Sequence, residues 1–242
     1  MKKIVASASR ATVLLLFLPL LWLPDLAGAW YDETHIAIAK AAGYKKWYNA
    51  AAADLVKVKA GRRESLNHYS ANPHDRVITT EMVFEQAEKY DKLTFSGHLY
   101  GAILGSLRTY IEEASRGEYP ENHMAFCAHY IGDLSQPLHN TEYNAYNKRC
   151  HSLTDGRINA DVLKHLDKIA IYPISLDSEK DVAAHIARIA NLSIRKGAEL
   201  ENENRLISKA EAYRQIGHSA SLLKAVIHYA EKKTTAARKN KR

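Results

Sequence analysis

Histidine and aspartate residues recur at regular spacings in the middle of this 242-residue chain. Asp133 lies four residues after His129, so a helix would place both side chains on one face. Pro137 disfavours helical backbone at the residue before it, which predicts that this helix ends there and that His139 follows on a turned segment. Imidazole nitrogen and carboxylate oxygen both bind zinc, so one helix face and the following loop can serve two adjacent ions.

A second His/Asp pair follows shortly afterwards. Asp155 lies four residues after His151, the same spacing as in the first pair. Taken alone, this segment also fits a loop with a turn at Asp155-Gly156. Beside the first pair, it predicts a further zinc-binding group.

The first 29 residues have the pattern of a secretory signal peptide. A basic start precedes an apolar run over residues 11–24, and small residues at 27–29 form a cleavage site. The apolar run is shorter than the ~20 residues that a membrane-spanning helix needs. We therefore expect export to the periplasm or outside the cell, no stable membrane insertion, and Trp30 as the first residue of the processed protein.

These residues together resemble the zinc-dependent bacterial phospholipases C and the related single-strand-specific zinc nucleases. Proteins of this superfamily begin with a tryptophan whose backbone binds zinc, carry a histidine soon after, and contain His-x3-Asp-x5-His followed by His-x3-Glu/Asp. The Gly-Asp-x-x-Gln-Pro-x-His segment is the most specific match. The resemblance covers essentially the whole processed chain, through the residues Trp30, His35, His129, Asp133, His139, His151 and Asp155.

The superfamily also has an aspartate and a histidine, about fourteen residues apart, between the N-terminal pair and the central motif. Asp54 and His68 have this separation, and His68 opens a His-Tyr-Ser-Ala segment similar to that of the family. Rival residues for these two positions lie nearby: Glu64, His74, Asp75 and His98. If His68 is the ligand, His98 is expected to be an ordinary core or surface residue. The same is expected of the other histidines: His123, His165, His185, His218 and His228.

The resemblance implies three zinc ions. The first would be held by Asp54, His68, His129 and Asp133. The second would be held by the amino nitrogen and carbonyl oxygen of Trp30 with His35 and Asp133, and the third by His139, His151 and Asp155. Asp133 would bridge the first two ions, and Asp54 would also orient the attacking water or accept its proton.

The implied activity is metal-assisted hydrolysis of phosphodiesters, with phospholipid or single-stranded nucleic acid as the substrate. Tyr69 directly follows His68 and is placed to stack on a base, but Ala71 stands where the nucleases have a residue that reads the base edge. The short gap between His139 and His151 is typical of the phospholipases.

Two other features are more typical of the nucleases, namely the short spacing from Trp30 to His35 and an aspartate at position 155. We therefore expect a phospholipase C, with a zinc nuclease as the alternative. A non-catalytic zinc-binding module is a third interpretation. No obligate protein partner is indicated.

Apolar residues at three- to four-residue spacing predict the helices that must position these groups. Such stripes cover residues 99–114, 182–189 and 206–227, with Ser96 as a candidate N-cap and Gly117 as a stop signal for the first. No strand-like alternation stands out. We expect an all-α, single-domain multi-helix bundle of the phospholipase C and zinc nuclease type over residues 30–231, followed by a basic flexible tail over 232–242.

Charge and cysteine content constrain the function less. Loss of residues 1–29, which carry three cations and one aspartate, lowers the formal net charge from +7 to +5. A basic surface suits both nucleic acid and anionic membranes. Cys127 and Cys150 lie close to proposed ligands, and in an exported protein they are either free or joined in a disulfide.

Overall fold

The computed structural model describes residues 30–89, 92–94 and 96–239. Within these residues the chain is helical, and its only strand pairing is an isolated bridge between Ser70 and Gly97. The prediction of an all-α fold is confirmed. The predicted signal peptide lies outside the described residues. In chain order the helices, with 3-10 helices marked η, are α1 (Asp32–Ala41), η1 (Trp47–Ala51), α2 (Ala52–Ala60), α3 (Arg62–Ser65), α4 (Thr80–Ala87), α5 (Leu99–Arg116), α6 (Glu121–Leu134), η2 (Pro137–His139), α7 (Ala145–Asp155), η3 (Val162–Lys164), η4 (Leu166–Lys168), α8 (Glu179–Asn202) and α9 (Lys209–Lys239).

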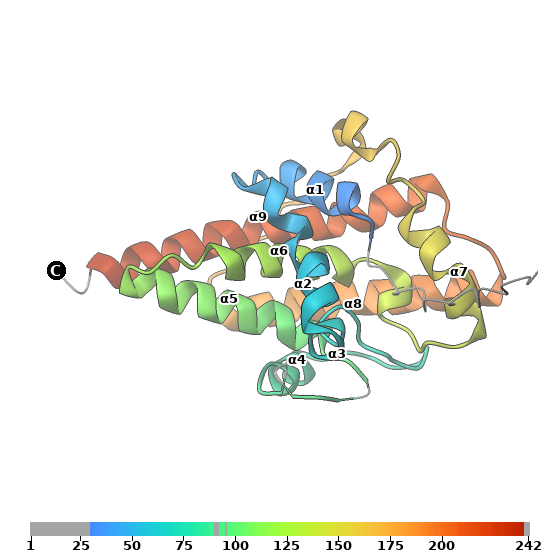
Figure 1. Cartoon of the computed structure of the whole chain (residues 1–242), viewed down its shortest axis with the longest axis horizontal. Helices are drawn as coiled ribbons and strands as arrows, with labels where there is room; N and C mark the ends of the chain where they lie inside the picture. Colours follow the sequence, from blue (N-terminus) through green and yellow to red (C-terminus); the bar gives the residue numbers. More distant parts are fainter. Residues whose placement is uncertain (1–29, 90–91, 95, 240–242) are drawn as a thin grey trace, which may run out of the picture.

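Four long helices, α5, α6, α8 and α9, run along the long axis of the molecule (Figure 1). The apolar stripe of α5 is buried against α6, with Leu99, Ile103 and Leu107 almost fully enclosed. Gly117 ends α5 in the left-handed conformation, at φ +85°, as its sequence position predicts. The predicted N-cap at Ser96 is wrong: the cap position is His98, whose N–H donates to the Leu66 carbonyl.

The C-terminal helices extend beyond the sequence prediction. Ser178 and Asp181 form a capping box at the start of α8, so this helix begins before the apolar stripe at 182. The flexible tail predicted from residue 232 is instead helical as far as Lys239. A contact of Arg238 stabilises this helical end, because its guanidinium donates two hydrogen bonds to the Ala114 carbonyl at 3.1 and 2.9 Å.

The two cysteines are buried and are not bonded to each other. Burial raises the pKa of the Cys127 thiol to about 12, and its Sγ lies 3.7 Å from the Ile103 carbonyl. Both cysteines therefore act as small core side chains rather than as a covalent link between α6 and α7.

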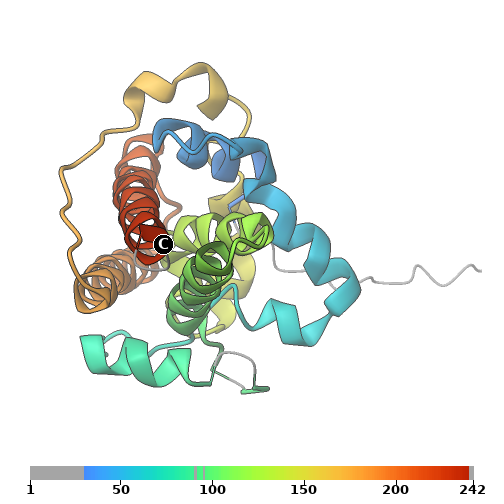
Figure 2. The same ribbon diagram turned by 90° about the vertical axis from the view of Figure 1, so that its left-hand side faces the viewer.

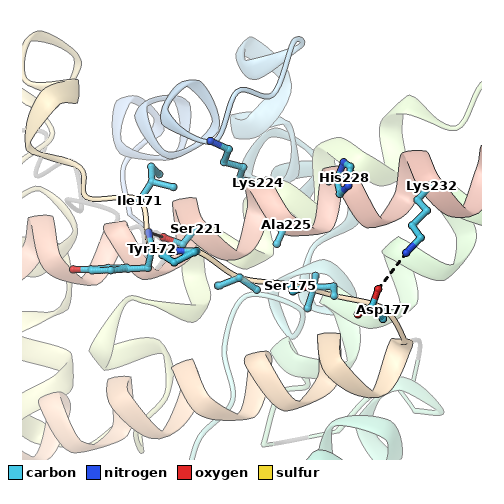
Figure 3. A pocket seen from close by; sticks show the side chains of 12 residues that line it. Ile171, Tyr172, Ser175, Asp177, Ser221, Lys224, Ala225, His228 and Lys232 are labelled. Carbon is cyan, nitrogen blue, oxygen red and sulfur yellow. Dashed lines mark hydrogen bonds and ion pairs between the residues drawn. The ribbon is translucent and has the colours of Figure 1, made fainter.

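A cavity of about 570 Å³ lies between the extended segment 171–177 and α9 (Figure 3). Its lining includes Lys224, His228 and Lys232 from α9, and Lys232 pairs with Asp177 at 3.2 Å. None of the predicted zinc ligands lines this cavity. Among the described helices, none combines the length and the apolarity that crossing a membrane requires.

Candidate metal centre

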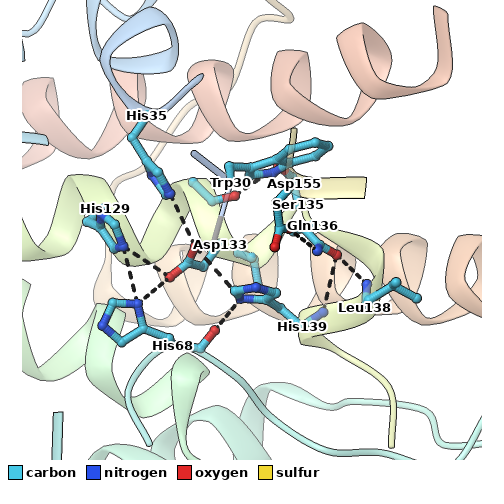
Figure 4. A network of polar contacts seen from close by, with 12 residues as sticks. Trp30, His35, His68, His129, Asp133, Ser135, Gln136, Leu138, His139 and Asp155 are labelled. Atoms are coloured by element: carbon cyan, nitrogen blue, oxygen red, sulfur yellow. Dashed lines mark hydrogen bonds and ion pairs between the residues drawn. The ribbon is translucent and has the colours of Figure 1, made fainter. Parts of the chain in front are cut away.

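The predicted side-chain ligands come from separate elements and meet inside the bundle. Figure 4 shows His35, His68, His129, Asp133, His139 and Asp155 among them. They lie on α1, α2, α6, η2, α7 and the turn after α3: His35, Asp54, His68, His129, Asp133, His139, His151 and Asp155. Every one of these except Asp54 is at least nine-tenths buried. The helix break before Pro137 is confirmed: α6 ends at Leu134, and Gln136 is extended with ψ 116°. This break turns His139 back toward Asp133.

Asp133 contacts four imidazoles through its two carboxylate oxygens. Oδ1 lies 3.3 Å from Nε2 of His35 and 3.7 Å from Nδ1 of His139. Oδ2 lies 3.0 Å from Nδ1 of His68 and 3.4 Å from Nε2 of His129. A carboxylate with different histidines at each oxygen has the geometry of a ligand that bridges two ions.

Three groups of side chains offer ligand atoms that all lie within 4.8 Å of one another. The groups are His35, Asp54 and His129; His68, His129 and Asp133; and His139, His151 and Asp155. The third has the membership expected for the third ion. The first two groups share His129. They differ from the expected ligand sets, because His35 is grouped with Asp54 and His129 and also faces Asp133.

Hydrogen bonds from Nδ1 orient three of the histidines. His129 donates to the Ala50 carbonyl at 2.8 Å, His139 donates to the His68 carbonyl, and His151 donates to Asn147 Oδ1 at 2.7 Å. An imidazole that donates from Nδ1 keeps the lone pair of Nε2 for a metal ion. These partners therefore fix both the tautomer and the direction of the ring.

His68 has the opposite orientation. Its Nδ1 faces Asp133, while its Nε2 lies 3.5 Å from the Glu64 carboxylate. Glu64 also accepts a hydrogen bond from Tyr130. Glu64, one of the rivals for a ligand position, thus lies behind His68 and supports it.

The other rival residues lie outside the three groups. His74 pairs with Glu201 at 3.2 Å, and its side chain is about one-third exposed. His98 is buried, with Nδ1 3.1 Å from the Thr94 hydroxyl. Neither residue, nor Asp75, joins a candidate metal group among the described residues.

Burial and charge give the ligands different protonation states. Burial disfavours ionisation of Asp133, but its contacts with His129, His139, His35 and His68 outweigh burial and hold its pKa well below 3.8. Burial, helped by the adjacent charge of His35, lowers the pKa of His129 to about 3. The ring centroids of His35 and His129 are only 3.8 Å apart. At neutral pH Asp133 and His129 thus present a carboxylate and a neutral imidazole, which are the forms that bind metal.

Several polar atoms of the groups make no hydrogen bond, although they are buried. They include both ring nitrogens of His35, Oδ1 of Asp133 and Oδ2 of Asp155. Buried polar atoms without hydrogen bonds cost about 1–3 kcal/mol each, so this concentration needs an explanation. A set of nitrogen and carboxylate donors around divalent cations supplies one, and the residues therefore fit zinc chemically.

Close packing holds His35 in position. A Cβ atom on Gly132 would lie 2.4 Å from Nδ1 of His35, so only glycine at this place in α6 allows α1 to approach. Trp30, five residues before His35, is fully buried, and its indole N–H points to the Ser135 hydroxyl at 3.4 Å. Figure 4 shows Trp30 in the same network as Asp133.

Tyr69, the predicted substrate contact, is half-buried and directly follows His68 in the chain. Its ring packs against Gly97, where a Cβ would lie 2.8 Å from the ring, and Gly97 has a φ of +70°. Burial raises the pKa of the Tyr69 phenol, and the charge of Arg62 opposes that effect. Tyr69 thus combines a restrained ring with a nearby cation.

Sequence reasoning missed two supporting residues. Gln136 accepts hydrogen bonds from the backbone of Leu138 and His139, while its amide donates to Asp155, so it links the central motif to α7. Asn147 orients His151 and donates to the Leu138 carbonyl at 2.8 Å. A signal for each was present, because Gln136 lies within the central motif and Asn147 precedes His151 by one helical turn.

Comparison with known proteins adds no further assignment. No protein-family model matches the chain, and no curated protein matches it in sequence. The three His/Asp groups and their supporting contacts are therefore the basis for a functional proposal.

Proposed function

We propose that this protein is an exported zinc-dependent phosphodiesterase of the phospholipase C and zinc nuclease type. The observation that carries the proposal is the arrangement around Asp133, whose two oxygens face four histidines and whose neighbour His139 belongs to a further group. One structural zinc needs four protein ligands, whereas these groups offer enough donors for several ions with open positions. Open positions are what a hydrolytic centre needs.

The reaction combines metal chemistry with positioning by the chain. Bound zinc supplies a Lewis acid that lowers the pKa of water and offsets the negative charge of a phosphate. Asp54 is the most open member of the groups, at 24% side-chain exposure, and it lies 3.7 Å from His68 and 3.8 Å from His129. In this proposal Asp54 orients the attacking water or accepts its proton.

Trp30 has a proposed role only after signal-peptide cleavage. The new α-amino group, whose pKa in a free peptide is near ~8, would become a neutral ligand with modest help from zinc. The burial of Trp30 and its position five residues before His35 support this role. A processed protein that keeps one extra residue before Trp30 should lose one zinc ion, because the amine becomes an amide.

Phospholipid is the proposed substrate, and single-stranded nucleic acid is the alternative. The restrained ring of Tyr69 beside the Arg62 charge favours the alternative, because an aromatic ring with a cation suits a nucleotide. The short connection from His139 to His151 and the absence of a base-edge reader at Ala71 favour phospholipid.

The decisive experiment uses processed protein beginning at Trp30, with zinc counted by elemental analysis. Release of phosphorylated head group from phosphatidylcholine micelles, abolished by a chelator and restored by zinc, is the expected result. Cleavage of single-stranded DNA with intact lipid would identify the nuclease instead. Zinc binding without hydrolysis even of a small chromogenic phosphodiester would overturn the enzymatic proposal and leave a metal-binding module.

A further inference from the structure

The corner formed by α2 and α3 carries aliphatic side chains exposed to solvent. Leu55 is 70% exposed and Val58 is 71% exposed. Figure 2 shows these two helices meeting on the outer side of the bundle. Two neighbouring large aliphatic side chains on an exposed helix face contribute little to the stability of the monomer and are available to a partner.

The buried residues of α2 show which way the exposed face with Leu55 and Val58 points. Ala53 and Lys57 are buried, and α2 packs on α6, α3 and η1. Asp54 lies on the side of the helix that faces His68 and His129. Leu55 and Val58, three residues apart, therefore share a different face that remains uncovered while the same helix supplies a candidate zinc ligand.

Exposed cations follow the two aliphatic side chains closely along the chain. Lys59, Arg62 and Arg63 are all exposed, and residues 55–63 contain no acidic residue. The next carboxylate, Glu64, is buried against Tyr130 and His68. The corner, which we define as residues 55–63, thus presents aliphatic side chains within a field of positive charge.

We propose that the corner docks on an anionic phospholipid surface, with Leu55 and Val58 entering the interface and the cations meeting lipid phosphates. Basic residues together with exposed aliphatic side chains are the signature of interfacial binding. Nucleic acid would use the cations but would gain nothing from Leu55 and Val58. Docking here brings the helix that carries Asp54 to the lipid surface, and the role of Asp54 in catalysis depends on the function proposed above.

Vesicle flotation of the zinc-loaded, processed protein tests the proposal. The vesicles contain phosphatidylcholine with or without phosphatidylglycerol, as analogues with a methylene in place of the scissile oxygen so that lipid is not consumed. Replacing Lys59 and Arg63 by glutamine should weaken binding to the anionic vesicles about thirty-fold, since each surface cation contributes roughly five-fold. Leu55→Ser with Val58→Ser should weaken it about ten-fold and leave the salt dependence unchanged.

Matched variants use the same substitutions elsewhere. Val77→Ser removes an aliphatic side chain that is 68% exposed, and Lys180→Gln with Lys224→Gln removes two other exposed cations. These controls should bind like the unaltered protein. Equal losses in the controls would overturn the corner as a specific surface, as would binding that survives both corner variants.

Two further measurements separate this proposal from the proposed function. The corner variants should hydrolyse a small soluble phosphodiester at the unaltered rate. If no phosphodiester is hydrolysed but the corner variants still lose vesicle binding, the function fails and the docking surface stands. If the glutamine variant loses single-stranded DNA binding while the serine variant binds vesicles normally, the surface serves nucleic acid and the lipid proposal is wrong.

Discussion

Asp133 and Asp155 are both fully buried carboxylates in candidate metal groups, but their surroundings have opposite effects on their charge. Four histidines hold the pKa of Asp133 well below 3.8. Burial instead raises the pKa of Asp155 well above 3.8, since one hydrogen bond from Gln136 is too little compensation and the charge of Asp133 adds to the shift. His151 pairs with Asp155 at 3.5 Å.

The opposite pKa shifts of Asp133 and Asp155 indicate how the metal group around each carboxylate binds a cation. Around Asp133 the ligands already stabilise the ionised carboxylate, so an ion enters a site whose charge is in place. The raised pKa of Asp155 favours its protonated form, so a cation must compete with that proton. The region around Asp133 is therefore preorganised, whereas the region around Asp155 is completed by the metal.

Replacing Asp133 by asparagine should have the largest effect. The four histidines lose a common charged partner, so more than one zinc ion and all hydrolytic activity should be lost. The metal-free protein should also lose roughly 3–5 kcal/mol of unfolding free energy, as is typical when one partner of a buried ionic contact is removed. Elemental analysis and urea unfolding in chelator measure the two effects.

The matched control is Asp161→Asn, which alters a partly exposed aspartate paired with Lys209. It should keep the full zinc content and a stability within about 0.5 kcal/mol of the unaltered protein. Full zinc content in the Asp133→Asn protein would mean that Asp133 is not a bridging ligand.

Asp155→Asn should separate metal binding from stability. Asparagine is neutral, nearly the same size, and can still accept the hydrogen bond from Gln136. The metal-free variant should be more stable than the unaltered protein at neutral pH by about 1–3 kcal/mol, because folding no longer raises the pKa of a carboxyl group that is ionised in the unfolded chain. It should nevertheless bind one zinc ion fewer. A metal-free variant that is less stable would show that Asp155 is well compensated.

The sequence was sufficient to predict the four long helices, the break before Pro137 and the spacing of the His/Asp pairs, because these depend on local periodicity and on proline. It could not predict which residues support them. The Ala50 carbonyl and the Glu64 carboxylate reach His129 and His68 from distant segments, and only the packing of η1 and α3 on α6 brings them there. The helical end of α9 was missed for a similar reason, since it depends on a contact between Arg238 and α5.

The pH dependence of unfolding should distinguish the two carboxylates in metal-free protein. Asp133 has a lowered folded-state pKa, so its contribution to stability is complete above about pH 4 and is lost as pH falls through the folded-state value. Asp155 has a raised pKa, so its cost is absent at low pH and grows as pH rises from 3.8 through the folded-state value. The deficit of Asp133→Asn should thus shrink in acid, and the gain of Asp155→Asn should vanish there. Parallel curves for the two variants would contradict the comparison.

Asn147→Ala should have the smallest effect, confined to the group that contains Asp155. The substitution removes the acceptor that fixes the His151 tautomer, so we expect the affinity for one zinc ion to fall about 10–100-fold while the other ions remain. Asn144→Ala is the control, because Asn144 caps the same helix and contacts Glu201 but does not touch His151. Asn147→Asp keeps an acceptor for His151 but loses the amide donor to the Leu138 carbonyl, so it should restore zinc affinity only in part. If Asn144→Ala weakens zinc binding as much as Asn147→Ala does, the loss comes from fraying of α7 and not from the orientation of His151.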